Sequence, residues 1–159
     1  MVRMDSEAAE AVTGWVAGIA AVGTALAGGV FFAFSTFVMQ GLARLPAGEA
    51  TRAMRAINVT AVRPAFMTLL FGTAAVCVAA VVVGFRNGHP WLVAGALLYL
   101  VGTIGVTIAV NVPLNDRLEA GTVDWPVYLR DWVRWNHVRT LSSTSAAIGL
   151  VVAGLRLRR

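Results

Sequence analysis

Residues 131–155 read DWVRWNHVRTLSSTSAAIGLVVAGL, and this stretch joins a polar, aromatic segment directly to an apolar one. Its second part, residues 140–155, carries no charge but is shorter than the roughly 20 apolar residues that cross a bilayer. Nothing breaks a helix between Pro126 and Leu155, and proline is favoured in a first helical turn. Such a helix would be about 45 Å long. We therefore expect it to cross the membrane and to place its aromatic first turns in the interface.

Three further charge-free runs cover residues 11–43, 64–85 and 87–115, and each is long enough to span the hydrocarbon. Only 13% of the chain is charged and 58% is apolar, against about 25% charged residues in an average soluble domain. We predict an all-α, integral membrane four-helix bundle with a long fourth helix. It forms one membrane domain over residues 1–159, with membrane helices near residues 12–38, 64–85, 91–112 and 132–155.

Between the first two membrane helices, apolar residues recur at the spacing of an amphipathic surface helix: Ala50, Ala53, Met54, Ile57 and Ala61. Four crossings put both termini on one side of the membrane. The connections on the other side carry most of the arginines: Arg44, Arg52, Arg55, Arg63, Arg117, Arg130, Arg134 and Arg139. By the positive-inside rule we expect that side to face the cytoplasm, in the cytoplasmic membrane of a bacterium. The net charge of +5 is dispersed, which favours lipid as a partner and excludes a nucleic-acid surface.

Polar residues form stripes in the third and fourth helices. Thr103, Thr107 and Asn111 recur every four residues, and so do Asn136, Thr140 and Thr144. Both stripes lead to the same membrane surface, and we expect them to face each other because unsatisfied polar groups are costly in lipid. The threonines could instead bond their own helix backbone, but an amide is not satisfied so locally.

One histidine lies beside these stripes. An imidazole is suited to moving protons near neutral pH, and an arginine with asparagines can stabilise an oxyanion. We therefore expect Asn111, Asn115, Asn136 and His137 to line one cavity, with Arg139 close to it. The alternative is an interfacial histidine bonded to a carbonyl. His89 lies on the far side of the membrane and Cys77 is the only cysteine, so no metal site is predicted. A haem with His137 as its single axial ligand stays open.

Four motifs resemble one membrane family over nearly the whole chain. They are GVFFAFSTFVM at 29–39, RAINVTAVRPAFM at 55–67, GTIGVTIAVNVPLND at 102–116 and WNHVRT at 135–140. They are similar to the DUF1772 or anthrone oxygenase-like family, whose characterised fungal members oxidise anthrones to anthraquinones. The resemblance implies a small four-helix membrane protein. It implies catalytic roles for residues in the matching motifs, namely Asn111, Asn115, Asn136, His137 and Arg139. Asn58 and Arg63 match a further motif on the same side and are candidates for substrate binding.

On this resemblance the reaction needs no cofactor, because a deprotonated anthrone can itself pass an electron to O₂. His137 would be the base, and Arg139 with the asparagines would hold the oxyanion. The hydrophobic aromatic substrate would contact side chains of the stripes and nearby aromatic rings: Thr107, Thr140, Phe31, Phe34 and Trp135. The alternative for these rings is ordinary packing against lipid.

Two other classes of function stay open. An ion-coupled transporter usually keeps a carboxylate within the membrane, and the four charge-free runs contain none. Assembly as a homo-oligomer around a polar pathway would still allow transport. A non-enzymatic lipid-binding or partner subunit would explain the apolar helices but not the polar residues gathered at one membrane surface.

Overall fold

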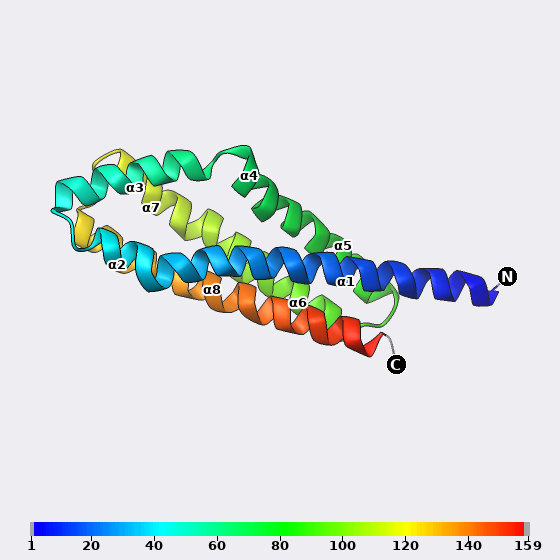
Figure 1. Cartoon of the computed structure of the whole chain (residues 1–159). Helices are drawn as coiled ribbons and strands as arrows, with labels where there is room; N and C mark the ends of the chain where they lie inside the picture. Colours follow the sequence, from blue (N-terminus) through cyan, green and yellow to red (C-terminus); the bar gives the residue numbers. More distant parts are fainter. Residues whose placement is uncertain (1, 158–159) are drawn as a thin grey trace.

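The computed structural model describes residues 2–157, with side chains from residue 8 onward. Every element in this range is helical (Figure 1). Along the chain the elements are α1 (Val2–Ala33), η1 (Phe34–Val38), α2 (Met39–Leu42), α3 (Ala47–Ala61), α4 (Pro64–Met67), η2 (Thr68–Gly72), α5 (Thr73–Arg86), α6 (Pro90–Tyr99), η3 (Leu100–Gly105), η4 (Thr107–Asn111), α7 (Val112–Glu119) and α8 (Trp125–Arg156), where η marks a π-helical turn.

Four of the described helices are long and apolar enough to cross a membrane: Ala8–Leu42, Pro64–Asn87, Pro90–Glu119 and Trp125–Arg156. The predicted all-α membrane bundle is confirmed, and each predicted span lies inside one of these helices. The long fourth helix is α8, which begins one residue before Pro126. The start of α1 and the end of α8 lie at the same end of the bundle (Figure 1), and we call this the terminal end.

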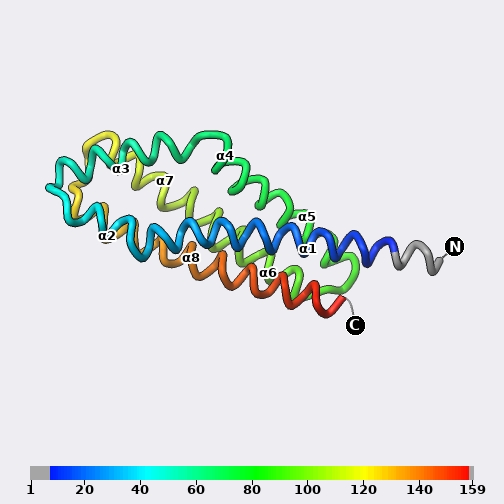
Figure 2. The backbone as a smooth tube through the Cα atoms, viewed as in Figure 1, coloured from blue at the N-terminus to red at the C-terminus, as the bar shows by residue number. Residues whose placement is uncertain are grey.

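The amphipathic helix between the first two spans is α3, and its apolar side packs on protein. Ala50 and Met54 are fully buried in a cluster with Leu118 of α7 and Tyr128 of α8. The backbone tube shows α3 alongside α7 (Figure 2). The Arg55 guanidinium donates from Nε and Nη2 to the Leu118 carbonyl, at 3.1 and 2.5 Å. Because that carbonyl belongs to the last turn of α7, Arg55 fastens α3 to the end of the third span.

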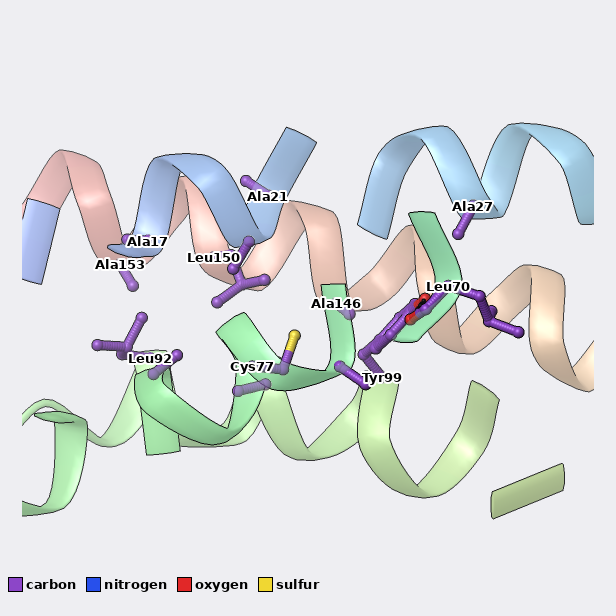
Figure 3. Close-up of a cluster of buried hydrophobic side chains, with 14 of the residues drawn as sticks. Ala17, Ala21, Ala27, Leu70, Cys77, Leu92, Tyr99, Ala146, Leu150 and Ala153 are labelled. Atoms are coloured by element: carbon purple, nitrogen blue, oxygen red, sulfur yellow. Dashed lines mark hydrogen bonds between the residues drawn. The ribbon is translucent and has the colours of Figure 1, made fainter. Parts of the chain in front are cut away.

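Two apolar cores follow each other along the bundle. The first fills the terminal half and is built from small residues of α1 and α8 around Leu92, Tyr99 and Leu150 (Figure 3). The second lies at the other end, which we call the site end, and holds Met39, Met54, Leu118, Trp125, Tyr128 and Trp132. Close approach in the first core depends on glycine: a Cβ on Gly95 would lie 3.1 Å from the Leu150 nitrogen. In lipid such backbone contact replaces the hydrophobic drive that water supplies to soluble bundles.

Three of the four spans contain π-helical turns, and α8 alone among them is regular over its described length. A π turn releases a backbone carbonyl from the α-helical ladder, and such turns often occur at functional sites. The Leu70 carbonyl in η2 accepts a hydrogen bond from the Tyr99 hydroxyl at 3.1 Å. The carbonyl of Phe31, just before η1, accepts a hydrogen bond from Asn136 Nδ2 at 2.7 Å. Side chains therefore satisfy carbonyls at these turns, as membrane interiors require.

Gly95→Ala should lower stability by about 1–3 kcal/mol, because its methyl group would meet Leu150 and the Ala146 carbonyl in a packed core. Gly29→Ala is the matched control: no atom lies within 4 Å of a Cβ there, so alanine should gain about 0.5–1 kcal/mol from helix propensity. Denaturant titration in detergent micelles measures both variants. Equal stabilities would contradict the close α6–α8 contact.

Reporter domains fused at residue 1 and at residue 159 should report the same cellular compartment. An even number of spans requires this, and the ends of α1 and α8 lie together. Reporters whose activity depends on compartment would check it in whole cells. Opposite compartments would mean that one of the four helices does not cross.

Candidate functional site: a buried polar layer with a lone arginine

A layer of polar side chains lies between the two apolar cores. We call this set the polar layer, and its members are Ser35, Thr107, Asn111, Asn136, Arg139 and Thr140. They come from η1, η4 and α8, so three of the four spans contribute. Thr140 is half-buried, and the other five side chains are buried. A buried polar group must find partners within the protein, and this requirement organises the layer.

Asn136 is the hub of the layer. It is 0% exposed. Its Nδ2 donates to the Phe31 carbonyl at 2.7 Å and to Ser35 Oγ at 2.8 Å, and both partners belong to the first span. Its Oδ1 accepts from Arg139 Nη2 at 2.7 Å. The amide therefore uses both donors and its acceptor, which fixes its orientation and binds α8 to the first span.

Arg139 is a buried cation, with 5% of its surface exposed. Its guanidinium carbon lies 4.4 Å from the centre of the Phe31 ring and 5.0 Å from that of Trp132. Nη1 donates to Thr107 Oγ1 at 3.4 Å. Aromatic faces stabilise a cation by roughly 2 kcal/mol when water is excluded, so the rings compensate part of the cost of burial.

No carboxylate among the described side chains neutralises this cation. The ion pairs of the described side chains are Arg55–Glu119 and Arg130–Asp131. Arg139 Nε is buried and has no hydrogen-bond partner. A buried charge is normally paired, because desolvation costs several kcal/mol per ion. The uncompensated charge and the free N–H together mark a place where an anionic oxygen would be stabilised.

Asn111 adds a free acceptor to the layer. Its Nδ2 donates to the Trp132 carbonyl at 3.4 Å, whereas its buried Oδ1 has no partner. The polar layer therefore holds one unpaired donor, on Arg139, and one unpaired acceptor, on Asn111. Unsatisfied buried groups are rare in folded proteins and each calls for an explanation, of which a bound ligand is one.

Asn115 lies one turn beyond Asn111, on α7, and is half-buried. Its Oδ1 accepts from the Tyr128 hydroxyl and from Trp132 Nε1, both at 2.9 Å. Asn58 of α3 approaches the same Tyr128 hydroxyl. Trp132 thus contacts Asn111, Asn115 and Arg139, so it joins the polar layer to the second core.

His137 does not lie with these residues. The expectation that it lines one cavity with Asn111 and Asn136 is wrong, because its side chain is exposed on α8 while Asn136 and Arg139 are buried. Adjacent positions on a helix point about 100° apart, so the neighbour of an inward asparagine faces outward. Its predicted role as a base has no support from this placement.

The predicted substrate-binding residues divide in the same way. Phe31 and Thr107 are buried against Arg139, and half-buried Phe34 packs on Trp132 with ring centres 5.6 Å apart. The Thr140 hydroxyl lies 3.2 Å from that of Ser35. By contrast, Trp135 is 36% exposed, and Arg63 is exposed at the break before α4. Their binding roles stay predictions.

The facing stripes are partly as expected. Thr103 and Ser143 join the third and fourth spans through hydroxyls 2.8 Å apart, and Thr107 donates to the Thr103 carbonyl at 2.7 Å. Thr144, expected on the inner stripe, is exposed, and Ser143 is buried in its place. Because four residues exceed one helical turn of 3.6 residues, a stripe with four-residue spacing rotates gradually around the helix. Ser143 therefore faces inward in place of Thr144.

Three residues of the site were not among the predicted site residues: Ser35, Tyr128 and Trp132. Ser35 could have been found as a polar residue inside an otherwise apolar stretch, FFAFSTFVM. The tryptophans of α8 all carry the sequence pattern of an interfacial belt. Nothing in the pattern separates the inward Trp132 from the outward Trp135 without the phase of the helix.

Asn136→Ala should cost at least about 2 kcal/mol of stability, because it leaves Arg139 Nη2 and the Phe31 carbonyl unpaired in a buried layer. His137→Ala, at the next residue, should change stability by no more than about 0.5 kcal/mol, since its side chain is exposed. Unfolding in the same detergent compares the two. A larger loss at residue 137 than at 136 would invert the assigned helix phase.

Among the described side chains, no three from His, Cys, Asp or Glu gather in a way that could hold a metal ion.

The comparisons with known proteins agree with the sequence motifs. No curated protein and no solved structure gave a significant match. The anthrone oxygenase family model matches residues 58–149, more than half of the chain and a range that includes Asn111, Asn136 and Arg139. The chain is therefore a membrane protein of the anthrone oxygenase family.

Proposed function

We propose that this protein is an oxygenase that oxidises an anthrone-like aromatic ketone with O₂ inside the membrane. The observation that supports it most strongly is Arg139, a buried cation with a free Nε–H and no acidic partner among the described side chains. Such a group binds an oxygen that gains negative charge during a reaction more strongly than it binds a neutral oxygen. Family membership supplies the reaction type.

The proposed reaction balances without a further reductant. Loss of one methylene proton converts the anthrone to its anthrolate, whose negative charge resides largely on the ketone oxygen. The anthrolate passes one electron to O₂, and the two radicals combine at the former methylene carbon as a peroxide anion, which takes up a proton to give the hydroperoxide. Loss of the second proton from that carbon, together with breaking of the O–O bond, expels hydroxide and leaves the second carbonyl; the proton and the hydroxide form water. One O₂ is consumed, and one quinone and one water are formed. Because the substrate itself reduces O₂, we propose that the protein needs no metal, haem or flavin.

In this scheme the polar layer favours the first step. Arg139 Nε would donate to the anthrolate oxygen and lower the cost of removing the proton. Asn136 holds the guanidinium through its Oδ1, which accepts a hydrogen bond from Nη2 and leaves Nε free for the substrate. The free Asn111 Oδ1 would accept a hydrogen bond from the substrate or from the hydroperoxide. Phe31 and Trp132, already stacked on Arg139, supply apolar faces for a flat aromatic molecule.

The structure leads us to propose that solvent, not His137, accepts the proton. His137 is exposed on α8, whereas the proposed substrate oxygen lies at buried Arg139. Stabilising the anthrolate by a few kcal/mol makes water or hydroxide at the site end a sufficient acceptor. We further propose that this end faces the cytoplasm of a bacterium, since the arginine-rich connections lie there.

Arg139→Gln should reduce kcat for O₂-dependent anthrone oxidation by about 100-fold or more, the usual cost of removing an oxyanion donor. Arg139→Lys should lose at least about tenfold, because a point charge replaces the planar fork that reaches both Asn136 and Thr107. His137→Gln should keep activity within about twofold, as its exposed position predicts. An oxygen electrode measures uptake by protein in nanodiscs, with empty nanodiscs correcting for spontaneous oxidation.

Two controls interpret the result. Unfolding curves separate lost chemistry from lost structure, because a purely structural role makes activity follow stability across the Arg139 variants. Incubation with a chelator should leave wild-type uptake unchanged. Full activity in Arg139→Gln would end the oxyanion assignment, and loss of activity in His137→Gln would restore the histidine. Wild-type uptake no faster than in empty nanodiscs would favour a transport, lipid-binding or partner-subunit role.

A further inference from the structure

We propose that the terminal end of the bundle binds one aminophospholipid, a lipid whose headgroup carries both a phosphate and a primary ammonium. Two adjoining grooves support this. One, of about 660 Å³, runs between α1 and α8, and the other, of about 540 Å³, lies between the ends of α1, α6 and α8. Glu10 and Leu157 line both grooves, so the two cavities meet. Each volume is typical of a small-molecule site.

The first groove has the form and chemistry of an acyl-chain site. Its α1 wall is made of small residues, including Gly14, Ala17, Gly18 and Ala21, and Leu150 and Val151 face them from α8. A Cβ on Gly14 or Gly18 would meet no atom within 4 Å, so the groove exists because side chains are missing there. From Glu10 to Ala21 the groove extends about 16 Å along α1. That is about half the hydrocarbon thickness of roughly 30 Å, the depth of one leaflet.

The second groove has the chemistry of a headgroup site. Arg156 lines it, with its guanidinium carbon 4.9 Å from the centre of the Trp91 ring. His89 lines it too and is half-buried in the turn before α6. Trp15 and Trp91 are 74% and 51% exposed at this end. Exposed tryptophans concentrate at the level of lipid headgroups, so the second groove lies where a phosphate would be.

The charges select the headgroup. Arg156 and His89 offer donors to a phosphate, and basic pockets between membrane helices bind such groups. Glu10 brings a carboxylate to the junction of the grooves. It would repel a headgroup with only negative charge, but it would accept hydrogen bonds from a primary ammonium. A choline headgroup has a positive charge but no N–H to donate. A headgroup with a phosphate and a primary ammonium therefore fits both Arg156 with His89 in the second groove and Glu10 at the junction.

This site is separate from the polar layer. Arg156 lies 17 residues after Arg139 on the regular helix α8, a separation of about 25 Å. The lipid-binding proposal therefore does not depend on the proposed oxidation, and a test of one does not test the other.

Full-length protein from nanodiscs with equal parts of phosphatidylethanolamine, phosphatidylglycerol and phosphatidylcholine tests the proposal. Native mass spectrometry after release into detergent identifies the lipid that stays bound. Wild type should retain one phosphatidylethanolamine per chain. Arg156→Gln should retain it about tenfold less, since a hydrogen bond to a charged group is lost. Glu10→Gln should lose the preference for phosphatidylethanolamine over phosphatidylglycerol. Arg52→Gln and Glu49→Gln, exposed on α3, are matched controls and should behave as wild type.

Gly18→Leu tests the groove itself. A Cβ at this position would meet no atom within 4 Å, and leucine favours the helix and extends into the groove, so retention should fall at least about tenfold in a folded protein. Gly29→Leu places the same side chain in open space elsewhere on α1 and should leave retention unchanged. Retention of phosphatidylglycerol above phosphatidylethanolamine would overturn the headgroup assignment. Undiminished retention in Gly18→Leu would overturn the groove, and a dimer lost in that variant would assign it to a second copy of this chain.

Discussion

The hydrogen bond from Arg139 to Asn136 is the constraint on which the rest of the membrane bundle depends. A guanidinium this deep among apolar helices must be held, and a single amide holds it while reaching the first span with its two donors. The same contact sets the rotation of α8, because Asn136 and Arg139 must both point inward. Trp132, one turn earlier, then faces inward as well and closes the second core. The layer therefore fixes helix phase, and the apolar cores on its two sides fill in around it.

A layer of this kind costs stability, since hydrophobic side chains of similar volume would pack there without a desolvation penalty. On the function proposed above, the excess charge and the two unpaired atoms bind the substrate. The aromatic rings of Phe31 and Trp132 stabilise the cation but leave its Nε without a partner. Preorganised donors of this type act on charge that develops during a reaction, because they need no rearrangement at that moment.

Much of the fold could be predicted from the sequence because charge-free length alone decides which segments cross a bilayer. The placement of Asn111 and Asn136 in one layer also follows from counting, since one ends a span where the other begins. Counting does not specify helix phase, that is, which side of each helix faces inward. Adjacency in the sequence groups His137 with Asn136, yet neighbours on a helix diverge by about 100°. Phase also decides between Ser143 and Thr144 and between Trp132 and Trp135, and it is set by contacts between distant segments that no local pattern records.

The π-helical turns bear on how related chains should be compared. A turn closed over five residues instead of four holds one residue more than its α-helical counterpart. A relative that lacks one of these turns would need a one-residue gap inside a membrane helix, where alignments usually forbid gaps. Forced to align without it, every later residue of that span would be paired with a neighbour facing about 100° away. Gaps should therefore be allowed within residues 34–38, 68–72, 100–105 and 107–111 before the columns containing Asn111 and Asn115 are judged variable.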